Sequence, residues 1–108
     1  MSKSIVIYVT CAGLEEAEKL GEFMVSNRYA ACVNIVPSIK SIYWWDNKLN
    51  KEQEALLIFK TKGSLFSLFK ENIKKQHSYS VPEIIAVEIA EGDEDYLSWI
   101  EKEATASS

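Results

Sequence analysis

Three short stretches of this sequence are apolar at every position, and they limit the possible folds more than any other feature. They are residues 5–9, 55–59 and 84–87, which are rich in the β-branched and aromatic side chains typical of strands. Successive residues of a strand point to opposite faces of a sheet, and a sheet with one face in water alternates apolar with polar residues. These stretches do not alternate, so a sheet built from them has two apolar faces to cover.

The rest of the pattern predicts strands and helices in one domain spanning residues 1–108. In chain order we expect a strand over 5–9, a helix from 14 to about 28, a hairpin of strands 29–45 and 49–61, a helix from 63 to about 77, a strand over 84–90 and a helix beginning at 92–93. This β-α-β-β-α-β order with a terminal helix predicts an α+β, ferredoxin-like fold with an antiparallel sheet and a long protruding hairpin.

Single residues predict several details of these elements. Proline cannot donate to a sheet ladder, so we expect an edge or a bulge at Pro37 in the long second strand. Residues 46–48 have the composition of a hairpin turn. Asp93 suits the N-cap of the last helix, and residues 104–108 are expected to form a frayed tail.

A ferredoxin-like fold places its two helices on one face of the sheet and leaves the other face uncovered. Burying a large side chain contributes about 1.5–3 kcal/mol, so several apolar residues left in water favour an oligomer whose sheets pack face to face. The alternative is that the terminal helix folds back over this face. The residues expected there are Val6, Tyr8, Leu56, Ile58 and Ile84.

Charge and cysteine content argue against several classes of partner. The chain has 16 Asp and Glu against 12 Lys and Arg, a net charge of −4, whereas nucleic-acid binding draws on clustered cations. The apolar runs are far shorter than the about 20 residues that cross a bilayer, and the N-terminus lacks the features of a secretion signal. Cys11 and Cys32 are too few for a disulfide framework. We therefore expect a cytoplasmic protein without nucleic-acid or membrane partners.

Five segments carry a resemblance to a known family. They are residues 30–37 (AACVNIVP), 41–45 (SIYWW), 57–61 (LIFKT), 77–86 (HSYSVPEIIA) and 92–100 (GDEDYLSWI). In this order they closely resemble the CutA divalent-cation-tolerance family. The resemblance implies a ferredoxin-like subunit in a homotrimer, with the hairpin reaching onto a neighbour. It also implies a role in tolerance to divalent cations, copper above all, and a shape similar to the PII signalling proteins.

His77 is the only histidine, and imidazole suits borderline metals such as copper(II) and zinc. The resemblance implies that it matches a histidine proposed as a metal ligand in the family. The sequence departs from the family at Gln76, where some members carry a second histidine, and at Val9, where the family has a cysteine. Cys11 lies two residues further along the same face of the strand and could replace that cysteine in part. The alternative is a structural or merely exposed His77.

Aromatic and charged residues form two further groups of candidates. Tyr43 and Trp45 should share one side of the hairpin and Trp44 the other, as anchors of the trimer interface or as a stacking pocket. Lys60, Tyr79, Glu83, Glu52 and Glu54 could line a cleft between subunits. A structural ion pair is one reading of this group, and a pocket for a small molecule or an anion is the other. Cys32 is expected to pack in the interior.

No motif predicts catalysis. The sequence has no Gly-rich phosphate loop, no nucleophile elbow and no paired metal-binding histidines. We therefore expect a trimeric cytosolic protein, not an enzyme, that binds divalent metal without requiring a cofactor. The alternative is a PII-like trimeric sensor or scaffold that takes a small ligand or a protein partner in its inter-subunit clefts.

Overall fold

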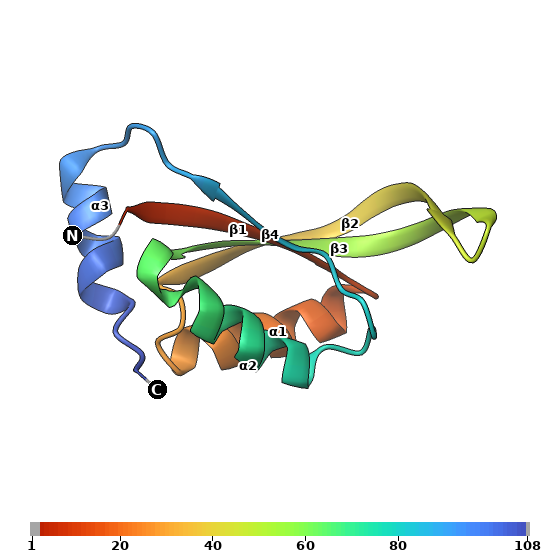
Figure 1. Cartoon of the computed structure of the whole chain (residues 1–108), viewed down its shortest axis with the longest axis horizontal. Coiled ribbons are helices and arrows are strands. Elements are labelled where there is room, and N and C mark those ends of the chain that lie inside the picture. The colour runs from red at the N-terminus through yellow and green to blue at the C-terminus, as the bar shows by residue number, and fades with distance from the viewer. Residues whose placement is uncertain (1–2, 108) are drawn as a thin grey trace.

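The computed structural model describes residues 3–107 and contains a four-stranded antiparallel sheet with two helices against one face (Figure 1). In chain order the elements are β1 Ser4–Cys11, α1 Leu14–Ser26, β2 Cys32–Trp45, β3 Lys48–Lys62, the 3-10 helix Gly63–Leu65, α2 Phe66–Gln76, β4 Ile84–Glu88 and α3 Glu94–Glu103. The strand order is β2-β3-β1-β4. The predicted α+β, ferredoxin-like fold with a terminal helix is confirmed.

The core lies between the sheet and the helices α1 and α2. Ile7 pairs with Phe59 of β3 and with Ala86 of β4, which places β1 in the middle of the sheet. Phe59 is fully buried and meets Phe69 of α2 edge-on, with 4.8 Å between ring centroids. Helix α1 comes close to the sheet at Gly21, where an added Cβ would lie 3.1 Å from a Val33 methyl group. These contacts fix which face of the sheet is internal.

The opposite face of the sheet carries a continuous group of apolar side chains, which we call the open sheet face. Ile85 is 52% exposed and Val87 is 50% exposed there. Strand pairing assigns its members, which are Val6, Tyr8, Leu56, Ile58, Ile85 and Val87. The expectation for Ile84 was wrong, because Ile84 pairs with Val9 and packs against the helix-side core. In a strand that is apolar at every position, the sequence does not indicate whether the odd- or the even-numbered residues face the helices.

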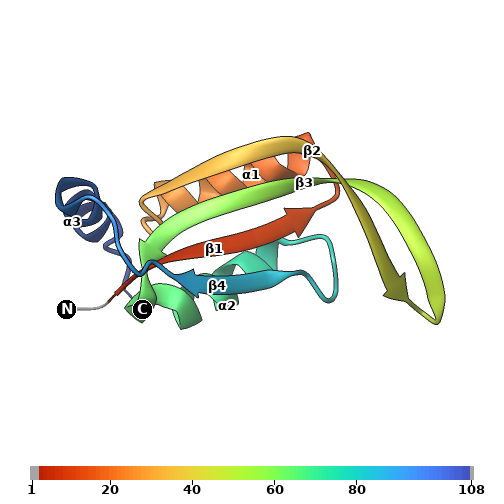
Figure 2. The ribbon, with the colours of Figure 1, turned by 90° about the horizontal axis from the view of Figure 1, so that it is seen from above.

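Helix α3 lies at one end of the sheet and leaves most of the open sheet face uncovered (Figures 1 and 2). Ile100 and Ala104 of this segment pack in a second small core with Ala31 and Leu65. The alternative that the terminal helix folds back over the whole face is therefore wrong for the described residues. Leu97 and Ile100 are the side chains of α3 that pack in this second core.

The β2–β3 hairpin extends well beyond the rest of the sheet (Figures 1 and 2). Its two-residue turn has positive φ at Asp46 (53°) and Asn47 (61°), as a type I′ turn requires. The register of β2 against β3 shifts between Val36 and Ile39, so the predicted irregularity at Pro37 is a bulge. The hairpin also exposes apolar side chains to solvent, and Trp44 is 72% exposed.

The C-terminal segment differs in part from the prediction. Asp93 caps α3 as expected, because its carboxylate accepts a hydrogen bond from the Tyr96 amide at 3.1 Å. The tail is anchored instead of frayed, since Ala104 is fully buried and the Ala106 amide donates to the Arg28 carbonyl at 3.0 Å. Ser108 lies outside the described residues. Within residues 3–107, every helix is too short or too polar to traverse a lipid bilayer.

Candidate functional site

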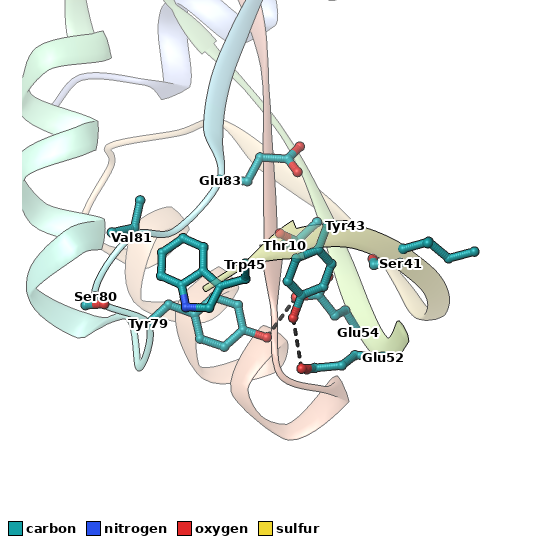
Figure 3. A pocket seen from close by; sticks show the side chains of 11 residues that line it. Thr10, Ser41, Tyr43, Trp45, Glu52, Glu54, Tyr79, Ser80, Val81 and Glu83 are labelled. Atoms are coloured by element: carbon teal, nitrogen blue, oxygen red, sulfur yellow. Dashed lines mark hydrogen bonds between the residues drawn. The ribbon is translucent and has the colours of Figure 1, made fainter. Parts of the chain in front are cut away.

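A cavity of about 600 Å³ lies where the hairpin leaves the sheet, next to the loop that follows α2 (Figure 3). We call it the acidic pocket. Its lining comes from the end of β1, the hairpin and the loop before β4, and consists of Thr10, Ser41, Ile42, Tyr43, Trp45, Glu52, Glu54, Tyr79, Ser80, Val81 and Glu83. These lining residues include three carboxylates and no lysine, arginine or histidine.

Two tyrosines donate hydrogen bonds to two of the carboxylates (Figure 3). The Tyr79 hydroxyl donates to Glu54 Oε2 at 2.7 Å, and the Tyr43 hydroxyl donates to Glu52 Oε1 at 2.8 Å. Burial, followed by the bond to Glu54, raises the pKa of Tyr79. The bond to Glu52 is the main cause that raises the pKa of Tyr43. Both phenols therefore stay protonated and serve as donors.

Glu83 is the third carboxylate of the acidic pocket. Burial, and then the negative charge of Glu54, raises the pKa of Glu83 above its ordinary value. Both causes disfavour a second negative charge in a confined space. A cation that enters the pocket would relieve this repulsion.

His77 lies behind the pocket and holds its wall in place. The side chain is fully buried. Because an amide can only donate, Nδ1 accepts the bond from the Tyr79 N–H at 3.0 Å. Because a carbonyl can only accept, Nε2 carries the proton and donates to the Thr10 carbonyl at 2.8 Å. His77 is thus a neutral imidazole that joins the end of β1 to the loop carrying Tyr79.

Glu16 in the first turn of α1 fastens the same loop. Its carboxylate accepts hydrogen bonds from the Ser78 amide and the Ser78 hydroxyl, both at 2.8 Å, and from the Ala12 amide at 3.2 Å. Burial acts to raise the pKa of Glu16, but these hydrogen bonds outweigh it and hold the pKa below its ordinary value. The loop after α2 is therefore tied to both β1 and α1.

The residues predicted for a metal site do not form one as they stand. Both ring nitrogens of His77 are occupied by backbone groups. Cys11 is fully buried, its Sγ lies 3.6 Å from the Gly13 carbonyl, and burial raises its pKa to about 11, so it is a thiol at neutral pH. Among residues 3–107, no three His, Cys, Asp or Glu side chains gather closely enough to hold a metal ion.

Six residues that the sequence analysis singled out line the acidic pocket. They are Tyr43, Trp45, Glu52, Glu54, Tyr79 and Glu83. Tyr43 and Trp45 line the pocket together, which agrees with the prediction that they share one side of the hairpin, and Trp44 does not line it.

Other candidates lie elsewhere. Lys60 pairs with Val6 and Cys32 on β1 and β2, and its amine donates to Asn34. It is therefore not part of the pocket lining. Sequence reasoning missed Thr10, whose position at the end of β1 gives no chemical signal until the fold brings the loop after α2 beside it.

Comparison with known proteins identifies the family. Residues 5–103 match the family described as CutA1 divalent ion tolerance protein. The "Protein CutA 1, chloroplastic" of Oryza sativa subsp. japonica is 46% identical over 105 residues, covering 97% of this chain and 59% of that protein. The "Divalent-cation tolerance protein CutA" of Thermus thermophilus is 44% identical over 95 residues, covering 88% of this chain and 92% of that protein.

Solved structures give the same result. The divalent cation tolerance protein (Cut A1) of Thermus thermophilus superposes with a TM-score of 0.92 at 41% identity, covering 94% of this chain and 99% of that chain. CutA1 from Oryza sativa superposes with a TM-score of 0.92 at 45% identity, covering 99% of this chain and 97% of that chain. The chain spans 59% and 53% of the two plant relatives it matches. On sequence and on fold, this chain belongs to the CutA1 divalent ion tolerance family.

Proposed function

We propose that this chain works in tolerance to divalent cations, as a homotrimer and without catalysing a reaction. The role in cation tolerance rests on relatives named for it, among them the protein of Thermus thermophilus at 44% identity over 88% of this chain.

The open sheet face is the observation that supports assembly with other copies of the chain, and the family resemblance supplies the number three. Six large apolar side chains, two of them at least half exposed, form one surface. Fully burying an exposed side chain of this kind contributes up to about 1.5–3 kcal/mol, and the hairpin adds the exposed Ile42, Trp44 and Leu49. Covering both surfaces therefore favours assembly. An assembly in which hairpins embrace neighbouring sheets would cover both surfaces.

Light scattering tests the assembly directly. The expected mass is three times that of the 12.3 kDa chain. A mass equal to one chain at micromolar concentration would leave the open sheet face without a covering partner and would refute the homotrimer.

Copper binding through His77 is the finer form of the proposal, and it has a definite condition. Copper(II) can reach Nε2 only if the Thr10 carbonyl loses its donor, or Nδ1 only if the Tyr79 amide loses its acceptor. Calorimetric titration of copper(II) into the wild type and into a His77→Ala variant tests it. Saturable binding that disappears in a variant still folded by circular dichroism supports the site, and unchanged binding argues against it.

A PII-like sensor or scaffold is the second candidate function. The acidic pocket favours it, because a cavity of about 600 Å³ lies within the range of about 300–1,000 Å³ typical of small-ligand sites. A thermal-shift screen of metabolites tests this candidate, since a ligand specific for the folded state raises the melting temperature by mass action.

The cytoplasmic location stays a prediction, as relatives are described as chloroplastic and as periplasmic.

A further inference from the structure

We propose that the acidic pocket binds an organic polycation, a molecule with two or more protonated amines on an aliphatic chain, as in a polyamine. The inference goes beyond the role in divalent-cation tolerance and does not depend on it. It rests on the charge of the lining, on one unpartnered carboxylate oxygen of the buried residue Glu54, on the aromatic walls and on the lack of converging metal ligands among the described residues.

The charge of the lining favours a cationic ligand. Glu52, Glu54 and Glu83 contribute three carboxylates, and no basic residue lines the pocket. The ion pairs within residues 3–107 involve none of these three glutamates. Their charges are therefore not neutralised by a basic side chain within residues 3–107, and the field in the cavity attracts positive groups.

Glu54 supplies an acceptor that points at the cavity. The side chain is more than nine-tenths buried, as the residue is 7% exposed. Its Oε2 accepts from Tyr79, whereas Oε1 has no hydrogen-bond partner within residues 3–107. In the same residues every enclosed side-chain oxygen or nitrogen has a partner, so Oε1 must contact the cavity and not packed protein. A carboxylate oxygen that faces a cavity with a free lone pair is a site for an N–H donor of a ligand.

The walls suit the aliphatic and cationic parts of one molecule. Tyr43, Trp45 and Tyr79 border the cavity, and aromatic faces attract ammonium groups. The hydroxyls of Tyr43 and Tyr79 already donate hydrogen bonds to two of the lining glutamates, so the aromatic rings are the parts of these tyrosines that contact a ligand. Val81 gives an apolar lining for methylene groups.

The lack of a converging ligand set among the described residues distinguishes an organic polycation from a metal ion as the ligand. A divalent metal needs several oxygens converging at about 2.0–2.6 Å, and among the described residues no three acidic, histidine or cysteine side chains converge in that way. Separate carboxylates suit separate ammonium groups joined by a chain. Because the carboxylates accept hydrogen bonds, amines with N–H groups should bind better than quaternary ammonium groups.

Calorimetric titration of spermidine into the full chain, in the assembly state fixed by light scattering, tests the proposal. Saturable binding is expected for the wild type, with at least about tenfold weaker binding for Glu54→Gln and for Glu83→Gln, because each removes one charge-assisted partner. Glu91→Gln is the matched control: Glu91 is exposed, lies outside the pocket lining, and its variant should bind within about twofold of the wild type.

Comparison ligands separate the proposed recognition from general charge attraction. 1,8-Octanediol, a neutral chain of similar length, should not bind, and tetramethylammonium should bind more weakly than spermidine. The proposal is overturned if correctly assembled wild type does not bind spermidine, if Glu54→Gln and Glu91→Gln bind equally, or if magnesium at equal charge concentration displaces spermidine completely. A failure of this test leaves the mass and copper experiments unaffected, so it can be told apart from a failure of the proposed function.

Discussion

Replacing His77 by alanine should destabilise the protein even when no metal is present. The imidazole satisfies two backbone groups from different parts of the fold, the Thr10 carbonyl and the Tyr79 amide. It is fully buried, so water does not reach these groups while the ring is in place. The variant leaves both groups without their partner in the interior.

The size of the loss follows from these two groups. A buried donor or acceptor left unsatisfied costs about 1–3 kcal/mol, which gives about 2–6 kcal/mol for the pair. A water molecule that enters the space of the ring would bring the loss toward the lower limit. Even that limit is a large share of the about 5–15 kcal/mol by which a small domain is stable.

Urea unfolding followed by circular dichroism, in chelator-treated buffer at one fixed chain concentration, measures this loss. Gln76→Ala is the matched control, because Gln76 is the exposed neighbour and its variant should change stability by less than about 0.5 kcal/mol. His77→Gln, which retains a donor and an acceptor, should lose less than His77→Ala. A loss below about 1 kcal/mol for His77→Ala would refute the structural role and favour a ring that is kept for a ligand.

Three other positions give separate tests, and the acidic pocket adds a fourth. Glu16→Gln should lower the free energy of unfolding by about 1–2 kcal/mol at pH 7. Because the pKa of Glu16 in the folded protein is lowered from 4.5, this difference from the wild type should vanish as the pH falls through that pKa. Urea unfolding at several pH values measures it. Ile85→Asp should keep the chain folded but reduce the light-scattering mass, and an unchanged mass contradicts sheet-to-sheet packing. Asn47→Gly should stabilise the hairpin by about 0.5–1 kcal/mol in the same unfolding assay, since φ is 61° there. Because the pKa of Glu83 is raised, spermidine binding should weaken in calorimetry as the pH falls from neutral toward that pKa, and Glu83→Gln should flatten that dependence.

Local patterns were sufficient to predict most of the fold. The turn at Asp46 and Asn47, the cap at Asp93 and the bulge at Pro37 each depend on the chemistry of one or two residues, and the structure has all of them. The order of strands and helices then left few topologies to consider. The assignment of Ile84 failed because a strand that is apolar on both faces satisfies either parity equally well.

The site could be predicted only in part. Glu54, Tyr79 and Glu83 were candidates because charged or hydroxyl groups next to apolar strands need partners. The burial of His77 depends on the loop after α2 folding back to the end of β1, a contact between residues 67 positions apart. No local signal encodes such a contact, so the sequence could not separate a ligand from a structural histidine.

The hairpin has a consequence for how the protein can be studied. Pairing of β1 with β3 ends at Ala55, so residues 48–54 have β2 as their only neighbour, and both margins of this ribbon expose unpaired backbone groups. Isolated two-stranded ribbons are only marginally stable, and open margins accept further strands. Deuterium uptake along residues 39–54 should therefore be fast in a solitary chain and slow once another copy seals the ribbon, which makes these amides an internal gauge of assembly.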